Sequence, residues 1–180
     1  MLKRRTLLKD ESGVTAVEFA LVAPPFLLLL LGIIELGLTL FTQTVLDGAA
    51  RDAARLVRTG QVQQGATTVA AQLNAFQTTL CSSLRVLLSS SACAQNVYVD
   101  LETFPSFSAV RFTGTCNQNS NQAGNGNPCP FVQVNPRTIA AVQVRYNRPS
   151  LIGYVGRYLA GVSEMTTLSS TVIFQSEPFQ

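Results

Sequence analysis

A run of apolar residues near the N-terminus constrains this chain more than any other feature. From Val17 to Phe41 the sequence is almost wholly apolar, and roughly 25 residues would span about 37 Å as a helix. That length crosses a bilayer with some tilt. A secretory signal peptide is a poor alternative, because its apolar region has only about 7–15 residues and ends at a small-residue cleavage site. The run therefore predicts a transmembrane helix.

Charges and cysteines indicate the orientation of that helix. A basic cluster lies before the run, which places the N-terminus in the cytoplasm and the rest of the chain on the far side of the membrane. The cluster consists of Lys3, Arg4, Arg5 and Lys9. All the cysteines follow the run: Cys81, Cys93, Cys116 and Cys129. An even number of cysteines beyond a membrane segment indicates disulfides, with free buried thiols as the alternative. Four cysteines allow three pairings. We expect a single-pass membrane protein.

The composition argues against several classes of function. The formal net charge is +3, and the basic residues form no patch beyond the first few positions, so we expect no nucleic-acid partner. The chain contains no histidine, which removes the commonest general base and the commonest metal ligand. The cysteines form no CxxC pair, and no serine or carboxylate constellation has a recognisable catalytic spacing. We therefore expect no catalytic residues, no metal, no cofactor and no enzymatic activity.

Two carboxylates and two prolines interrupt the apolar run. A lone ionised carboxylate in lipid costs at least a few kcal/mol, so Glu18 and Glu35 are candidates for a function or for a paired role. For Glu35, burial against other protein or a place near the membrane boundary is the simpler alternative. Pro24 and Pro25 remove two backbone donors and predict a kink or a local break in the helix.

The start of the run resembles a known processing site. Residues 13–19, Gly-Val-Thr-Ala-Val-Glu-Phe, resemble the prepilin-peptidase site of type IV pilins and particularly of the Tad (Flp-type) pseudopilins. The resemblance implies cleavage between Gly13 and Val14, which would make Glu18 the fifth mature residue. Phe19 stands where the major Tad pilins usually have tyrosine. Glu18 would then neutralise the new amine of Val14, in its own subunit or in a neighbour. The implied partners are the prepilin peptidase, other Tad pilins and their assembly machinery.

Helical patterns continue beyond the membrane segment. In residues 42–58 one face is apolar and suited to close packing: Leu46, Ala49, Ala50, Ala53 and Val57. Gly60 is a natural end for this helix. Residues 66–88 predict a second amphipathic helix, which Ser89, Ser90 and Ser91 should end. A Cys81–Cys93 bridge would tie this helix to the following strand.

The pattern then changes to the alternation of strands. Strands are expected at residues 96–104, 108–113, 139–147 and 167–174. The polar loop at 114–136 contains Cys116 and Cys129, and a bridge between them would staple it. Residues 150–162 are apolar and interrupted by glycine, and are expected to form a short helix or a contact segment. The expected fold is α+β, with a helix packed on a small antiparallel sheet of three or four strands.

Two further segments resemble TadE-like proteins: residues 49–61, and the final strand with the Glu-Pro-Phe that follows it at 177–179. The resemblance divides the chain into a leader (1–13), a transmembrane and extended helix (14–60) and a periplasmic or extracellular α+β domain (61–180). It implies a minor pilin or pseudopilin of the Tad secretion and pilus system, which is anchored in the bacterial inner membrane with its C-terminal domain in the periplasm and takes part in pilus assembly. The alternative is an uncleaved single-pass protein whose periplasmic domain binds or scaffolds that machinery.

Overall fold

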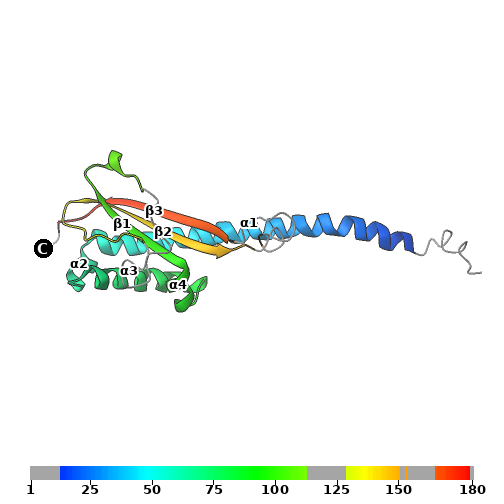
Figure 1. Ribbon diagram of the computed structural model, residues 1–180, viewed down its shortest axis with the longest axis horizontal. Coiled ribbons are helices and arrows are strands. Elements are labelled where there is room, and N and C mark those ends of the chain that lie inside the picture. Colours follow the sequence, from blue (N-terminus) through cyan, green and yellow to red (C-terminus); the bar gives the residue numbers. More distant parts are fainter. Residues whose placement is uncertain (1–12, 113–128, 151–152, 154–164, 179–180) are drawn as a thin grey trace, which may run out of the picture.

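The computed structural model describes residues 13–112, 129–150, 153 and 165–178. The chain forms one long helix and an α+β head that packs on the second half of that helix (Figure 1). In chain order the elements are α1 (Val14–Arg58), α2 (Gln61–Gly65), α3 (Val69–Ser83), the 3₁₀ turn η2 (Leu84–Val86), α4 (Ser90–Asn96), β1 (Val97–Phe104), the 3₁₀ turn η3 (Phe107–Ala109), β2 (Ile139–Pro149) and β3 (Met165–Gln175).

The long helix α1 joins the two parts of the molecule. Its first half projects from the head, and its second half lies along the sheet (Figure 1). The helix runs through Pro24 and Pro25 without interruption, so the expected local break is wrong. The leucines that follow are strong helix formers and continue the helix beyond the lost donors. The helix ends at Arg58, and Gly60 follows with a φ of 76°, the left-handed conformation expected of glycine after a helix.

The three strands form an antiparallel sheet in the order β1-β2-β3. Val99 pairs with Val144, and Val144 pairs with Ser170 on the next strand. Alternate residues therefore share a face across all three strands. One face packs against α1 and α3 (Figure 1). The expected α+β architecture, with an antiparallel sheet beside helices, is confirmed.

The core lies between that sheet face and the two helices. The predicted apolar face of residues 42–58 is fully buried there, as is most of the predicted face of α3. The core residues with almost no exposed surface include Leu46, Ala50, Ala53, Val57, Leu73, Phe76, Leu80, Leu84, Val99, Leu101, Val142 and Val144. At about 25 cal/mol per Å² of apolar surface, burial of such side chains is the main force that holds the head on α1.

The expected strand at 108–113 is wrong over its described residues. Residues 107–109 form η3, and residues 110–112 pair with no strand. The edge of β1 is occupied near Leu101 by residues 130–132 instead. The Leu101 N–H donates to the Pro130 carbonyl at 3.0 Å, and the Val132 N–H donates to the Leu101 carbonyl at 3.0 Å. The segment from a later part of the chain thus takes the position that a local hairpin would have used.

The serine triplet also behaves differently from expectation. α3 ends before it at Ser83, and Ser89 starts a new helix, α4. The Ser89 hydroxyl accepts a hydrogen bond from the Ala92 N–H at 3.3 Å, which is the role of a helix N-cap. Cys93 therefore lies on a short helix between α3 and β1. Four regions with expectations attached lie outside the described residues: the leader up to Ser12, the loop at 113–128 with Cys116, most of the segment at 150–162, and Phe179.

Candidate functional site: the membrane helix and its junction with the head

The residues expected at the processing site occupy the first turns of α1. Gly13 is the N-cap residue and makes no side-chain cap, and Val14 begins the helix. Val14 is 49% exposed and Phe19 is 74% exposed. Glu18 is also exposed, and no salt bridge reaches its carboxylate within the described residues. Because residues four apart lie on the same helix face, Glu18 sits one turn above the Val14 nitrogen.

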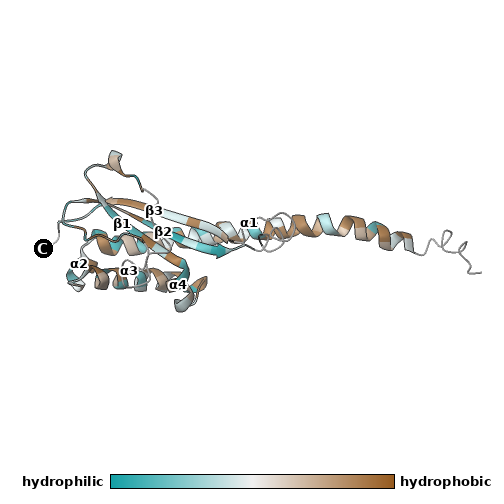
Figure 2. Cartoon of the chain, viewed as in Figure 1, coloured by the Kyte–Doolittle hydropathy of each residue, from teal (hydrophilic) through white to brown (hydrophobic). Residues whose placement is uncertain are grey.

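The first half of α1 presents its apolar side chains outward. It contains a window long and apolar enough to cross a membrane, and none of that window is buried against the rest of the protein. Figure 2 shows the apolar colouring along this projecting half. Its large exposed side chains include Leu21, Val22, Phe26, Leu27, Leu28, Leu29, Ile33 and Ile34. A surface of this size needs an apolar environment to cover it.

The second carboxylate of the apolar run is paired at the point where α1 meets the head. Arg148, at the end of β2, donates from Nη2 to the Glu35 carboxylate in a charge-assisted hydrogen bond. Its Nη1 donates to Thr39 Oγ1 at 3.3 Å, and its Nε donates to the Pro149 carbonyl at 3.3 Å. The Glu35 and Arg148 side chains are only 12% and 10% exposed. One arginine thus binds two positions that are one turn apart on α1.

Sequence analysis missed Arg148, although its position carries a signal. Tyr146 and Val144 face the core, and Arg148 continues the same two-residue alternation on β2. An arginine on the core-facing side of a strand requires a buried partner. Glu35 is a carboxylate whose place in an apolar run requires a partner of the opposite charge. The two halves of the pair are 113 residues apart in sequence, so only the fold brings them together.

A small recess of about 240 Å³ lies beside this pair. Its lining is mainly apolar: Leu38, Thr42, Leu87, Tyr146, Arg148 and Pro149. Burial raises the pKa of Tyr146, and the nearby charge of Arg148 opposes that rise. The phenol therefore stays neutral at physiological pH and acts as part of the apolar wall.

Two further contacts fix α1 to the head. Gln43 Nε2 donates to the Ser169 carbonyl of β3 at 3.0 Å and to Asp47 Oδ1 at 3.0 Å. At the far end of the helix, the Glu177 N–H donates to the Arg58 carbonyl at 2.9 Å, and the two side chains approach to 3.4 Å. α1 is therefore held near its middle and at its C-terminal end, as one unit with the sheet.

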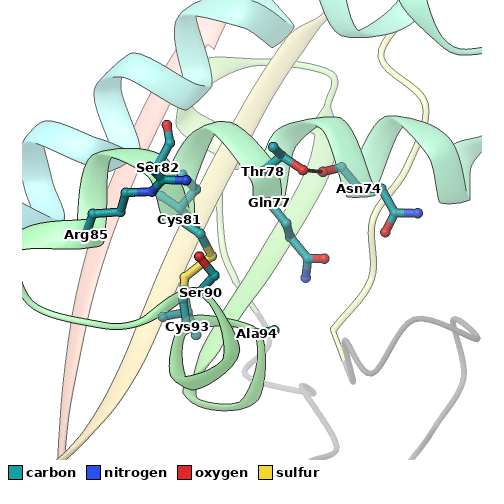
Figure 3. Close-up of a pocket in the computed structure, with 11 residues that line it drawn as sticks. Asn74, Gln77, Thr78, Cys81, Ser82, Arg85, Ser90, Cys93 and Ala94 are labelled. Carbon is teal, nitrogen blue, oxygen red and sulfur yellow. Dashed lines mark hydrogen bonds between the residues drawn. A yellow bond between two sulfur atoms is a disulfide. The ribbon is translucent and has the colours of Figure 1, made fainter.

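A disulfide and a cavity lie beside α3 and α4. Cys81 of α3 and Cys93 of α4 are joined, closing a segment with a sequence separation of 12. A cavity of about 330 Å³ opens beside the bridge (Figure 3). Amides, hydroxyls and one guanidinium line it, including Asn74, Gln77, Thr78, Ser82, Ser90 and Arg85. Cys129 is also in a disulfide, and Cys116 lies outside the described residues.

One buried acid lies on the sheet face opposite the core. Burial, and secondly the charge of Glu102, raise the pKa of Asp100 to about 6. The Arg145 guanidinium lowers the pKa of Asp100, but by a smaller amount. Its Nη2 lies 3.9 Å from Asp100 Oδ2, and its Nε donates instead to Gln143 Oε1 at 2.8 Å. Among the described residues, no cluster of three histidine, cysteine or acidic side chains could hold a metal ion.

The described residues define an α+β head carried on an apolar helix that is long enough to span a membrane. The model of the family described as TadE-like protein matches residues 13–55, which are Gly13 and all of α1 except its last three residues. This match confirms the TadE-like resemblance over that segment and indicates a protein related to the Tad pilus. A search of curated proteins found no match, and neither did a search of solved structures.

Proposed function

We propose that this chain is a TadE-like minor pilin or pseudopilin that takes part in assembly of a Tad-type pilus as a structural subunit, without enzymatic activity. One observation carries the proposal. The family match at residues 13–55 includes the projecting half of α1, which is exposed and apolar and bears the exposed carboxylate of Glu18. The chain also contains no histidine, which supports a non-enzymatic role.

In the proposed function, Gly13, Val14 and Glu18 each take part in processing or assembly. A prepilin peptidase cuts between Gly13 and Val14, and Val14 gains a free ammonium group. Glu18 then lies within one helical turn of that group. In a bundle of apolar helices, an isolated charge is unfavourable and an opposite charge on a neighbour compensates it. Glu18 thereby favours insertion of a subunit whose Val14 amine lies beside it.

Processing is tested by intact mass and N-terminal sequencing with and without the peptidase. A chain that begins at Val14 only in the presence of the peptidase supports the proposal. A Gly13→Leu variant should stay uncut. The Gly32→Leu variant is the matched control, since a Cβ atom added at either glycine meets nothing within 4 Å, and it should still be cut. If the wild-type chain keeps Met1 in the presence of the peptidase, the uncleaved membrane-anchored module is the correct alternative.

The role of Glu18 is tested separately. Glu18→Gln removes the charge with little change in size, and should abolish or strongly reduce piliation while the protein still accumulates in the membrane. Thr15→Gln alters a neighbouring exposed position without touching the carboxylate and should leave piliation intact. Unchanged piliation in Glu18→Gln would refute the charge-neutralisation step.

A further inference from the structure

We propose that the base of the head lies within the lipid headgroup layer, so that the head rests on the membrane surface instead of standing clear of it. The contact surface, termed here the base collar, consists of Leu36, Leu38, Leu40 and Phe41 of α1 together with Val86 of η2. This inference rests on the proposed membrane anchoring. It adds the position of the head and the residues that contact lipid.

The first argument is length. From Val14 to Ile34 the helix rises about 30 Å, which matches the hydrocarbon core of a bilayer. Apolar exposure continues for about seven more residues, as far as Phe41, which adds about 10 Å. The headgroup regions bring a bilayer to about 40–45 Å in total. One headgroup layer is therefore about 5–8 Å deep, and the additional exposed segment is long enough to pass through it.

The second argument is where exposure of apolar side chains stops. Leu36, Leu40 and Phe41 are 61%, 60% and 51% exposed, although the head already contacts α1 at Glu35. After Phe41 the helix has no large exposed hydrophobic side chain. Its exposed positions from Thr44 onward are polar, charged or glycine. The apolar surface of the membrane helix thus continues for nearly two helical turns past Glu35 and ends at Phe41.

The third argument is charge. A lone carboxylate or guanidinium at the edge of the hydrocarbon would oppose immersion of the base. Glu35 and Arg148 are paired and nearly buried there, so the pair adds no net charge at this depth. On α1, the first charged residue after the collar is Asp47, which is only partly exposed and accepts a hydrogen bond from Gln43. The first exposed charged residue is Arg51, which lies about 15 Å beyond Phe41 along the helix axis.

The fourth argument is the place of η2. Leu87 lines the same recess as Leu38 and Thr42, so the end of η2 lies at the level of the collar. Its neighbour Val86 is 69% exposed, and Arg85 is exposed beside it. An apolar side chain next to a cation is the combination that favours an anionic lipid surface. The lipid surface is therefore the occupant that both elements fit.

The test uses the absence of tryptophan from the chain, which allows single tryptophan reporters. Full-length variants Ile33→Trp, Phe41→Trp, Val86→Trp and Phe107→Trp are reconstituted in vesicles of phosphatidylcholine and phosphatidylglycerol. Ile33 reports the membrane core, and Phe107, which is 58% exposed on η3, reports the far end of the head. Quenching is measured with lipids brominated near the headgroup, with lipids brominated deep in the chain, and with iodide in the water.

The expected result is graded. Ile33→Trp loses emission with deep bromines, Phe41→Trp and Val86→Trp lose emission with shallow bromines, and Phe107→Trp loses emission with iodide alone. If Phe41→Trp and Val86→Trp follow Phe107→Trp while Ile33→Trp is still quenched by lipid, the collar inference is overturned and membrane anchoring stands. If neither lipid nor iodide quenches Phe41→Trp, a protein covers the collar and the inference is also wrong. If no lipid quenches Ile33→Trp, membrane anchoring itself fails.

Discussion

Removing one partner of the Glu35–Arg148 pair should destabilise the head far more than removing both. Arg148→Met deletes the donors to Glu35, Thr39 and the Pro149 carbonyl, and leaves a carboxylate whose side chain is only 12% exposed. Loss of one member of a buried pair costs about 3–5 kcal/mol. Glu35→Leu leaves the guanidinium in the same position and should cost a similar amount. The double variant leaves no buried charge, so its cost should be about 1–2 kcal/mol, because the hydrogen bond to Thr39 is still missing.

The assay is chemical denaturation of the detergent-solubilised protein, followed by the tertiary signal of the head. The two single costs and the double cost give a coupling free energy, which we expect to exceed about 3 kcal/mol. The denaturant slope should stay unchanged, because the same surface is exposed on unfolding. Gln43→Ala is a matched control, since it removes a contact between α1 and β3 without leaving a charge behind. Additivity of the two single changes to within about 0.5 kcal/mol would refute the argument that the pair acts as a unit.

Two further predictions concern the head. Because the folded pKa of Asp100 is raised from 3.8 to about 6, its contribution to stability is greatest below pH 3.8 and is lost as the pH rises through about 6. Asp100→Asn should therefore stabilise the head by up to about 3 kcal/mol at pH 7.5 and by much less at pH 4; thermal melts at both values check this, and an equal effect at both would contradict it. Replacing Cys81 and Cys93 together by alanine should cost about 3 kcal/mol, the loss expected on opening a loop with a sequence separation of 12. Denaturation against the oxidised protein measures this, and an unchanged stability would mean that α4 holds its place without the bridge.

The spacing of apolar residues predicted those helices and strands in which the core-facing residues lie close together in the sequence. The apolar face of residues 42–58 follows from a spacing of three and four, and the core-facing side of residues 139–147 follows from alternation. Both patterns place apolar residues on the side that faces the core, and the structure confirms this burial at Leu46 and Val144. Such elements can be predicted because each apolar residue of the face lies only two to four positions from the next.

Contacts between distant segments could not be predicted in this way. The edge of β1 is taken by residues 130–132, which are more remote in the sequence than residues 108–113. Nothing in the local sequence ranks these two competitors. The same limit applies to Arg148, whose alternation marks it as core-facing but does not name its partner. The sequence indicates that Glu35 needs a counter-ion, and the fold brings Arg148 at the end of β2 into that role.

Glu35 and Glu18, the two carboxylates of the apolar helix, differ in whether their own subunit supplies a counter-ion. Glu35 is neutralised within its own subunit by Arg148, so its charge requires nothing from a neighbour. Glu18 is exposed in the first turns of α1, and none of the salt bridges among the described residues involves it. A charge of this kind is stable in an apolar bundle only when another molecule or the new terminus supplies its counter-ion. Of the two, Glu18 is thus the one whose environment would change in the proposed assembly, while Glu35 is already paired with Arg148 across the junction of helix and head.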